Sequence, residues 1–121
     1  MRIDKILPQI EQPIIYYKTI VEFLGSLNAA VFLCYFAFLD ERGENSVVIA
    51  KTSKEIEDDT GLTIKQQKTA RKILKERGYL KEELRGIPAT IHYIFDWDKF
   101  NNDLINFINK KVLRNFEKMF L

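Results

Sequence analysis

The stretch between Thr63 and Arg85 is the part of the chain whose residue types could best bind a ligand. It carries eight Lys or Arg against three Glu, a net charge of +5, whereas the whole chain has a net charge of only +2. The preceding stretch, from Ser53 to Thr60, has one Lys against four acidic residues, a net charge of −3. Positive charge segregated in this way is the electrostatic footprint of a surface that binds phosphate groups.

The residue types in this stretch predict that the ligand is duplex DNA. Lysine and arginine bind phosphates, glutamine can make two hydrogen bonds to adenine, and threonine bonds a phosphate or contacts a thymine methyl group. In a helix that enters the major groove, the N-terminal half lies nearest the base edges. The predicted base contacts are Lys65, Gln66 and Thr69, and the predicted phosphate contacts are Lys68, Lys72 and Arg85.

Two other residues of the stretch are candidates for DNA contact with a second role open to them. Thr63 could donate to a phosphate from the start of the helix, although its expected role is to cap that helix. Arg71 is expected at the flank of the helix, where it either contacts the DNA backbone or pairs with an acidic side chain. A basic face that is merely solvated is the alternative to DNA binding, and RNA stays open as a ligand.

The elements that must position these residues are two helices joined by a short turn. Ser53 is the predicted N-cap of the first helix, and Gly61 is predicted to end it, because glycine adopts the left-handed cap conformation at little cost. Thr63 is the predicted N-cap of the second helix, which ends at Gly78. Two helices separated by a turn that contains glycine, the second of them basic, are typical of a helix-turn-helix. The buried side of the second helix is predicted to consist of Gln67, Ala70, Ile73, Leu74 and the methylenes of Arg77.

A small β-sheet is predicted beside these helices. Two strands, at residues 79–84 and 90–95, follow the second helix around a tip that contains Gly86 and Pro88. Proline cannot donate to a β-ladder, so Pro88 belongs at the tip or at an edge. A third strand is predicted at residues 47–50, which are mostly β-branched. A helix-turn-helix followed by such a hairpin is a winged helix.

The residues before the helix-turn-helix are predicted to be mostly helical. Residues 1–13 are expected to form a loosely helical or extended arm, and residues 14–24 a short helix that Gly25 stops. Residues 26–40, capped by the serine or the asparagine near their start, are apolar nearly all round and predict a buried central helix. The predicted fold class is therefore α+β: a single winged helix-turn-helix domain over residues 1–121, with a small three-stranded sheet.

A resemblance to a known family supports this fold. The run TSKEIEDDTGLTIKQQKTARKILKERGYL…RGIPATIHYIFDWDKF resembles the winged-helix domains of phage and plasmid replication proteins, the replisome organisers and initiators. The upstream run LGSLNAAVFLCYFAFL resembles the first helix of those domains. The resemblance covers residues 14–100, and the combination of NAA, TGL, GIP and Y-x-x-D carries it. It implies a core at residues 14–100 and a protein of DNA replication or transcription.

A long C-terminal helix is predicted over residues 97–121, with Asp96 as its N-cap. Its first half is expected to pack on the core. From Lys111 onward the helix carries so many apolar residues that part of its surface is expected to be covered by other protein. Three arrangements would cover that surface: folding back over the first helices, a two-fold dimer, or a partner protein. The predicted interface residues are Phe107, Val112, Leu113, Phe116, Met119 and Phe120.

Catalytic, metal-binding and membrane functions are not expected. The chain has no phosphate loop, dinucleotide fingerprint or G-x-S-x-G motif, and no cofactor is predicted. His92 and Cys34, the single histidine and single cysteine, cannot form the usual zinc sites. The carboxylates of EIEDD at residues 55–59 suit the start of a helix through its dipole. With no secretory signal, no run of eighteen apolar residues and one cysteine, a cytoplasmic location is expected.

The sequence thus predicts a protein that binds double-stranded DNA, as a homodimer, through a recognition helix at residues 63–77 and a wing at residues 79–95. Its expected role is that of a small transcriptional regulator or a replication-associated protein. The alternative is a winged helix that binds a replication or transcription protein through residues 97–121 and serves as a subunit, adaptor or inhibitor.

Overall fold

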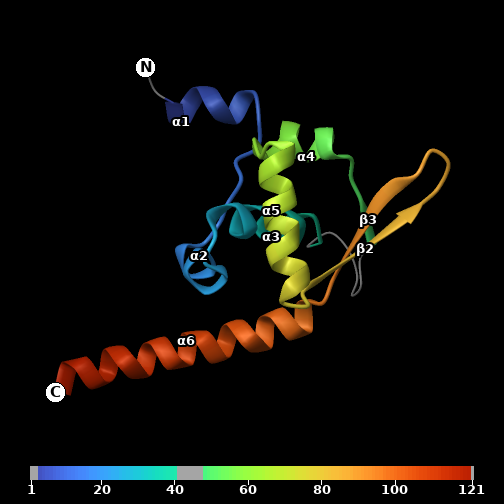
Figure 1. Ribbon diagram of the computed structural model, residues 1–121. Helices are drawn as coiled ribbons and strands as arrows, with labels where there is room; N and C mark the ends of the chain where they lie inside the picture. The colour runs from blue at the N-terminus through green and yellow to red at the C-terminus, as the bar shows by residue number, and fades with distance from the viewer. Residues whose placement is uncertain (1–2, 41–47, 121) are drawn as a thin grey trace.

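The computed structural model describes residues 3–40 and 48–120 (Figure 1). This part of the chain is an α+β structure with six α-helices, one short 3-10 helix and one three-stranded antiparallel sheet. In chain order the elements are α1 (Ile3–Ile6), the 3-10 helix η1 (Leu7–Gln9), α2 (Lys18–Leu24), α3 (Leu27–Asp40), β1 (Val48–Ala50), α4 (Ser53–Thr60), α5 (Ile64–Glu76), β2 (Leu80–Arg85), β3 (Thr90–Phe95) and α6 (Trp97–Phe120).

Helix α3 is the centre of the hydrophobic core, as its apolar sequence predicts. Ala29, Ala30, Phe32 and Phe36 are fully buried. The rings of Phe32 and Phe36 lie 5.7 and 4.9 Å from the ring of Tyr93 on β3, so α3 packs directly against the sheet. Helix α5 packs against α3, which places the element with the basic residues over the core.

The sheet has the order β1-β3-β2, with both neighbouring pairs antiparallel. Strands β2 and β3 form the predicted hairpin, although β2 begins and ends one residue later than predicted. Leu80 pairs with Phe95 at one end of the hairpin and Arg85 with Thr90 at the other. Strand β1 is the predicted third strand, and Val47, the first residue predicted for it, lies outside the described residues.

The helix predicted at residues 14–24 is shorter in the structure. Only Lys18–Leu24 is helical, and Tyr17, its N-cap residue, is extended, with φ −110° and ψ 132°. The four residues before Lys18 are Ile-Ile-Tyr-Tyr, and β-branched and aromatic side chains lose rotamer freedom in a helix. Gly25 ends α2 in the left-handed conformation, with φ 71°, as predicted.

Side chains cap the starts of α3, α4, α5 and α6, and one predicted cap is wrong. Thr52, and not Ser53, is the N-cap of α4: its Oγ1 accepts from the N–H of Glu55, whose carboxylate accepts in return from the N–H of Thr52. This capping box needs Glu or Gln three residues after the cap, and Thr52 meets that condition, whereas Ser53 is followed three residues later by Ile56. The predicted caps of α5 and α6, Thr63 and Asp96, are present.

Helix α6 packs on the core only through its first half. Phe100 is buried, and the ring of Phe107 lies 5.2 Å from that of Phe23 on α2. The helix then continues away from the body of the molecule (Figure 1). Phe116 and Phe120 are 59% and 71% exposed, so this half does not fold back over the first helices. Helix α6 contains no Gly or Pro, the residues at which sharp kinks in helices usually occur, and it continues without a kink.

Within residues 3–40 and 48–120, no helix is both long enough and apolar enough to cross a membrane.

Candidate nucleic-acid interface

The turn between α4 and α5 fixes the orientation of α5. Gly61 ends α4 with φ 80°, a left-handed conformation that few residues other than glycine adopt at low cost. The side chain of Gln67 is fully buried beneath the turn, and its Nε2 donates to the carbonyl oxygens of Ser53 and Leu62, both at 2.9 Å. One amide on α5 thus holds the start of α4 and the end of the turn.

The outward side of α5 carries a row of lysines. Gln67, Ala70 and Leu74 are buried against the core, as predicted, and the lysines lie on the opposite side of the helix. Lys65, Lys68 and Lys72 are exposed, and they make no ion pair with any residue in the described part of the chain. Their spacing of three and four residues aligns them along one side of a helix, over roughly 10 Å. We call Lys65, Lys68 and Lys72 the lysine row.

The polar residues predicted to read bases have other hydrogen bonds in this structure. Thr63 and Gln66 form the capping box of α5: Thr63 Oγ1 accepts from the N–H of Gln66, and Gln66 Oε1 accepts from the N–H of Thr63 at 3.0 Å. This hydrogen bond uses one of the two lone pairs of Gln66 Oε1 and ties the amide to the N-terminus of α5. Thr69 is exposed, and its hydroxyl donates to the carbonyl of Lys65 at 3.2 Å.

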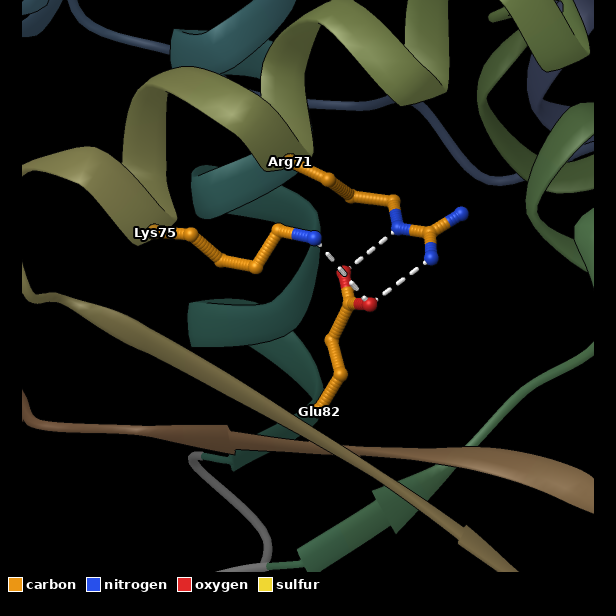
Figure 2. A network of polar contacts seen from close by, with 3 residues as sticks. All are labelled: Arg71, Lys75 and Glu82. Atoms are coloured by element: carbon orange, nitrogen blue, oxygen red, sulfur yellow. Dashed lines mark hydrogen bonds and ion pairs between the residues drawn. The ribbon is translucent and has the colours of Figure 1, made fainter.

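Arg71 is not part of the exposed basic surface, because it pairs with the hairpin. Its Nε donates to Glu82 Oε1 at 2.6 Å and its Nη2 to Glu82 Oε2 at 2.8 Å, while Lys75 reaches the same carboxylate at 3.4 Å (Figure 2). The side chains of Arg71 and Glu82 are only 15% and 16% exposed. Of the two roles expected for Arg71, the structure shows the pairing with an acidic side chain.

The electrostatics of this pair are mutual. The hydrogen bonds from Arg71 hold the pKa of the Glu82 carboxyl below its ordinary value, and Glu82 in turn raises the pKa of Arg71. The guanidinium also lies over the ring of Tyr93, 5.7 Å from its centroid. Arg71 therefore joins α5 to both strands of the hairpin and holds the hairpin against this helix.

One predicted phosphate contact, Arg85, lies on the hairpin at its turn end, where it pairs with Thr90 across the strands. Arg85, at the end of β2, is half-exposed, and its Nε donates to Glu83 Oε2 at 2.9 Å. Beside it, Leu84 is 71% exposed and Ile87 fully exposed at the turn. Glu83 neutralises part of the charge of Arg85, so the basic surface is centred on α5 rather than on the hairpin.

The remaining chemically distinctive residues lie elsewhere. His92, on β3, is half-buried, with Nδ1 3.0 Å from the carbonyl oxygen of Thr90. Cys34 is buried in α3, and burial raises the pKa of its thiol. Among the described residues, no three His, Cys, Asp or Glu side chains are grouped so that they could hold a metal ion.

Comparison of the chain with models of protein families, with characterised proteins and with solved structures gives no match. What the protein binds must therefore be inferred from its own surface.

Proposed function

We propose that the chain is a winged helix-turn-helix domain that binds double-stranded DNA, with α5 as its recognition helix and the β2–β3 hairpin as its wing. The observation that carries this proposal is the lysine row. Its three lysines, which have no ion-pair partner within residues 3–40 and 48–120, lie on the outward side of a helix that Gln67 holds to the turn and the Arg71–Glu82 pair holds to the hairpin. Such a helix can meet a row of phosphates with little loss of conformational entropy.

The proposed docking follows from the direction of α5. Its N-terminal half would enter the major groove, with Lys65 and Thr69 nearest the base edges. Lys68 and Lys72 would bind phosphates, and Arg85 would reach the backbone after leaving Glu83. Turning the Gln66 amide away from Thr63 toward a base would give up its capping hydrogen bond, at a cost of about 1 kcal/mol. Phosphate contacts would therefore supply most of the affinity.

The proposed role is that of a small transcriptional regulator or a replication-associated protein of the cytoplasm. It is a binding role rather than a catalytic one, and it needs no cofactor. The resemblance to phage and plasmid replication proteins supports it, as do the net charge of the stretch from Thr63 to Arg85 and its exposure on α5.

The test is fluorescence anisotropy of a labelled random-sequence duplex, titrated with the protein at several salt concentrations. Each phosphate contact contributes about 0.9 to the slope of log K against log[salt]. The double variant Lys68→Ala/Lys72→Ala is expected to reduce that slope by about 2. A duplex that fails to bind at low salt, with the protein folded, would refute the proposal.

A matched control separates the lysine row from charge in general. Lys110 and Lys118 lie on α6, are exposed and carry the same charge as Lys68 and Lys72. The variant Lys110→Ala/Lys118→Ala is expected to keep the wild-type salt slope. If both double variants flatten the slope equally, the binding is a general effect of net charge and α5 is not the docking surface.

A further inference from the structure

Helix α6 carries a second exposed surface, which the proposed DNA binding does not use. Seven large apolar side chains on it are between 37% and 78% exposed. Leu113 lies about 80° around the helix from Ile105, and the other six lie within about 60° of Ile105. We call these six side chains the apolar stripe: Ile105, Ile108, Val112, Phe116, Met119 and Phe120.

The apolar stripe is separate from the side of α6 that packs on the core. Phe100, Leu104 and Phe107 form that packed side, and at 100° per residue the centre of the stripe lies about a third of a turn away. The stripe runs for about four turns, or roughly 24 Å. The charged residues of this half, such as Lys110 and Arg114, fall on the opposite side of the helix, so the stripe itself carries no charge.

A mainly apolar groove continues the stripe onto the body of the molecule. It lies between α2 and α6, has a volume of about 540 Å³, and is lined in part by Tyr17, Ile20 and Leu104. Ile108 and Val112 belong both to the groove and to the stripe. At its wall, Lys111 Nζ on α6 lies 2.6 Å from Glu22 Oε2 on α2, in a solvent-exposed ion pair that bridges the two helices.

We propose that the stripe and the groove are covered by α6 of a second copy of this chain, in an antiparallel, two-fold symmetric contact. The stripe begins at Ile105 and ends at Phe120, so a two-fold axis next to Val112 sets the whole stripe against itself. Ile105 of one copy then faces Phe120 of the other. The end of the second helix, with Phe116 and Met119, covers the groove, and the contact is repeated symmetrically on the second copy.

The size of the surface supports this occupant. The exposed parts of six side chains of this kind amount to on the order of 700 Å², and the groove wall adds to them. A standard protein–protein interface takes about 800 Å² from each partner. The largest apolar patch on a typical monomer is about 300–600 Å². The stripe therefore exceeds what a monomer usually exposes and matches what one half of a dimer contributes.

This inference does not rest on the proposed DNA binding. No residue of the stripe belongs to α5 or to the hairpin, and the two contacts respond differently to salt. An uncharged apolar contact is expected to persist or strengthen at high salt, whereas binding to phosphates weakens steeply. A failure of one proposal therefore leaves the other standing.

Sedimentation equilibrium of the wild-type chain, whose mass is 14.3 kDa, tests the proposal directly. We expect a dimer whose dissociation constant rises at least tenfold in Phe116→Glu, because the symmetry places two carboxylates in the contact. Phe116 is 59% exposed, so the monomer should remain folded, as circular dichroism would show. Asn106→Glu adds the same charge on the same helix, off the stripe, and is expected to leave the dimer unchanged.

Two outcomes would overturn this assignment. A wild-type chain that stays monomeric at high concentration would reject the second copy and leave a different protein as the occupant of the stripe. A dimer that Phe116→Glu does not weaken would place the interface elsewhere.

Disulfide cross-linking tests the antiparallel direction. Val112→Cys lies next to the proposed axis and is expected to cross-link to its own copy under mild oxidation. Phe120→Cys would lie roughly 20 Å from its copy and is expected not to cross-link. Wild-type protein, with Cys34 buried, sets the baseline. Cross-linking of both variants would mean a parallel pair, and cross-linking of neither would reject this contact.

Discussion

Helix α5 and the second half of α6 both present a surface to solvent, yet they are built in opposite ways. On α5 the buried amide of Gln67 and the Arg71–Glu82 pair fix the backbone, and the outward side is charged. Beyond Lys111, α6 has no comparable anchor among the described residues, and its exposed stripe is apolar. Under the two proposals made above, the difference suits each helix to its partner: a fixed charged row to phosphates, and an unanchored apolar stripe to another apolar surface.

The largest expected effect comes from removing the anchor of α5. Glu82→Ala leaves the guanidinium of Arg71 largely buried and unpaired, and we expect the free energy of unfolding to fall by about 2–3 kcal/mol. Glu83→Ala removes a neighbouring carboxylate whose ion pair is half-exposed, and is expected to change that free energy by less than about 0.5 kcal/mol. Urea denaturation of both variants measures the contrast. Equal losses would mean that the Arg71–Glu82 pair does not anchor α5.

A smaller effect is expected from comparing the two parts of α6. Phe107 packs against Phe23, and Phe107→Ala is expected to cost about 1–2 kcal/mol of unfolding free energy. Phe120 is 71% exposed, and Phe120→Ala is expected to cost less than about 0.5 kcal/mol when the protein is dilute enough to be monomeric. Thermal denaturation at low and high protein concentration checks both values. A large loss for Phe120→Ala in the monomer would mean that the end of α6 packs within its own chain.

The smallest effect is expected at the caps of the two helices that form the turn. Thr52→Ala removes the capping box of α4 and is expected to cost about 1 kcal/mol, and Thr63→Ala should cost the same for α5. Ser53→Ala is the control, because Ser53 lies inside α4 and caps nothing, and it is expected to be nearly neutral. Denaturation midpoints rank the three variants. A loss at Ser53 that equals the loss at Thr52 would contradict the observed cap.

Local signals in the sequence predict much of this fold. Thr63 and Gly78 delimit the basic helix, and Gly61 ends the helix before it, because capping depends on a few adjacent residues. The same locality explains the error at Ser53, since a capping-box pattern beginning at Thr52 is present in the sequence. Strand β3 and the start of α6 at Trp97 were likewise predictable from alternation and from the cap at Asp96.

What the sequence does not predict depends on how separate elements meet. The pairing of Arg71 with Glu82 requires the register of the hairpin, in which Glu82 lies opposite Tyr93 and so faces α5. If the register of the hairpin could be predicted from the sequence, Arg71 would not have been counted among the predicted DNA contacts. Without it, the sequence leaves both roles of Arg71 open, contact with the DNA backbone and pairing with an acidic side chain.

The direction of the apolar residues on α6 is a second case. The predicted interface residues included Phe107, which packs on α2, and left out Ile105 and Ile108, which are exposed. Helical spacing shows that α6 has a wide apolar surface, but it does not show which part the body of the protein covers. The position of α2 determines which part is covered, because Phe23 on α2 packs against Phe107.

The continuity of α6 has a mechanical consequence. Because α6 runs from Trp97 to Phe120 without a break, the residues that pack on the core and the residues of the apolar stripe belong to one rigid helix. Adding one residue directly after Phe107, the last of the core-packed residues, would lengthen the helix by only about 1.5 Å. It would turn the following part of the stripe by about 100° relative to the body. The number of residues in α6 thus affects the direction in which the stripe faces far more than its distance from the body.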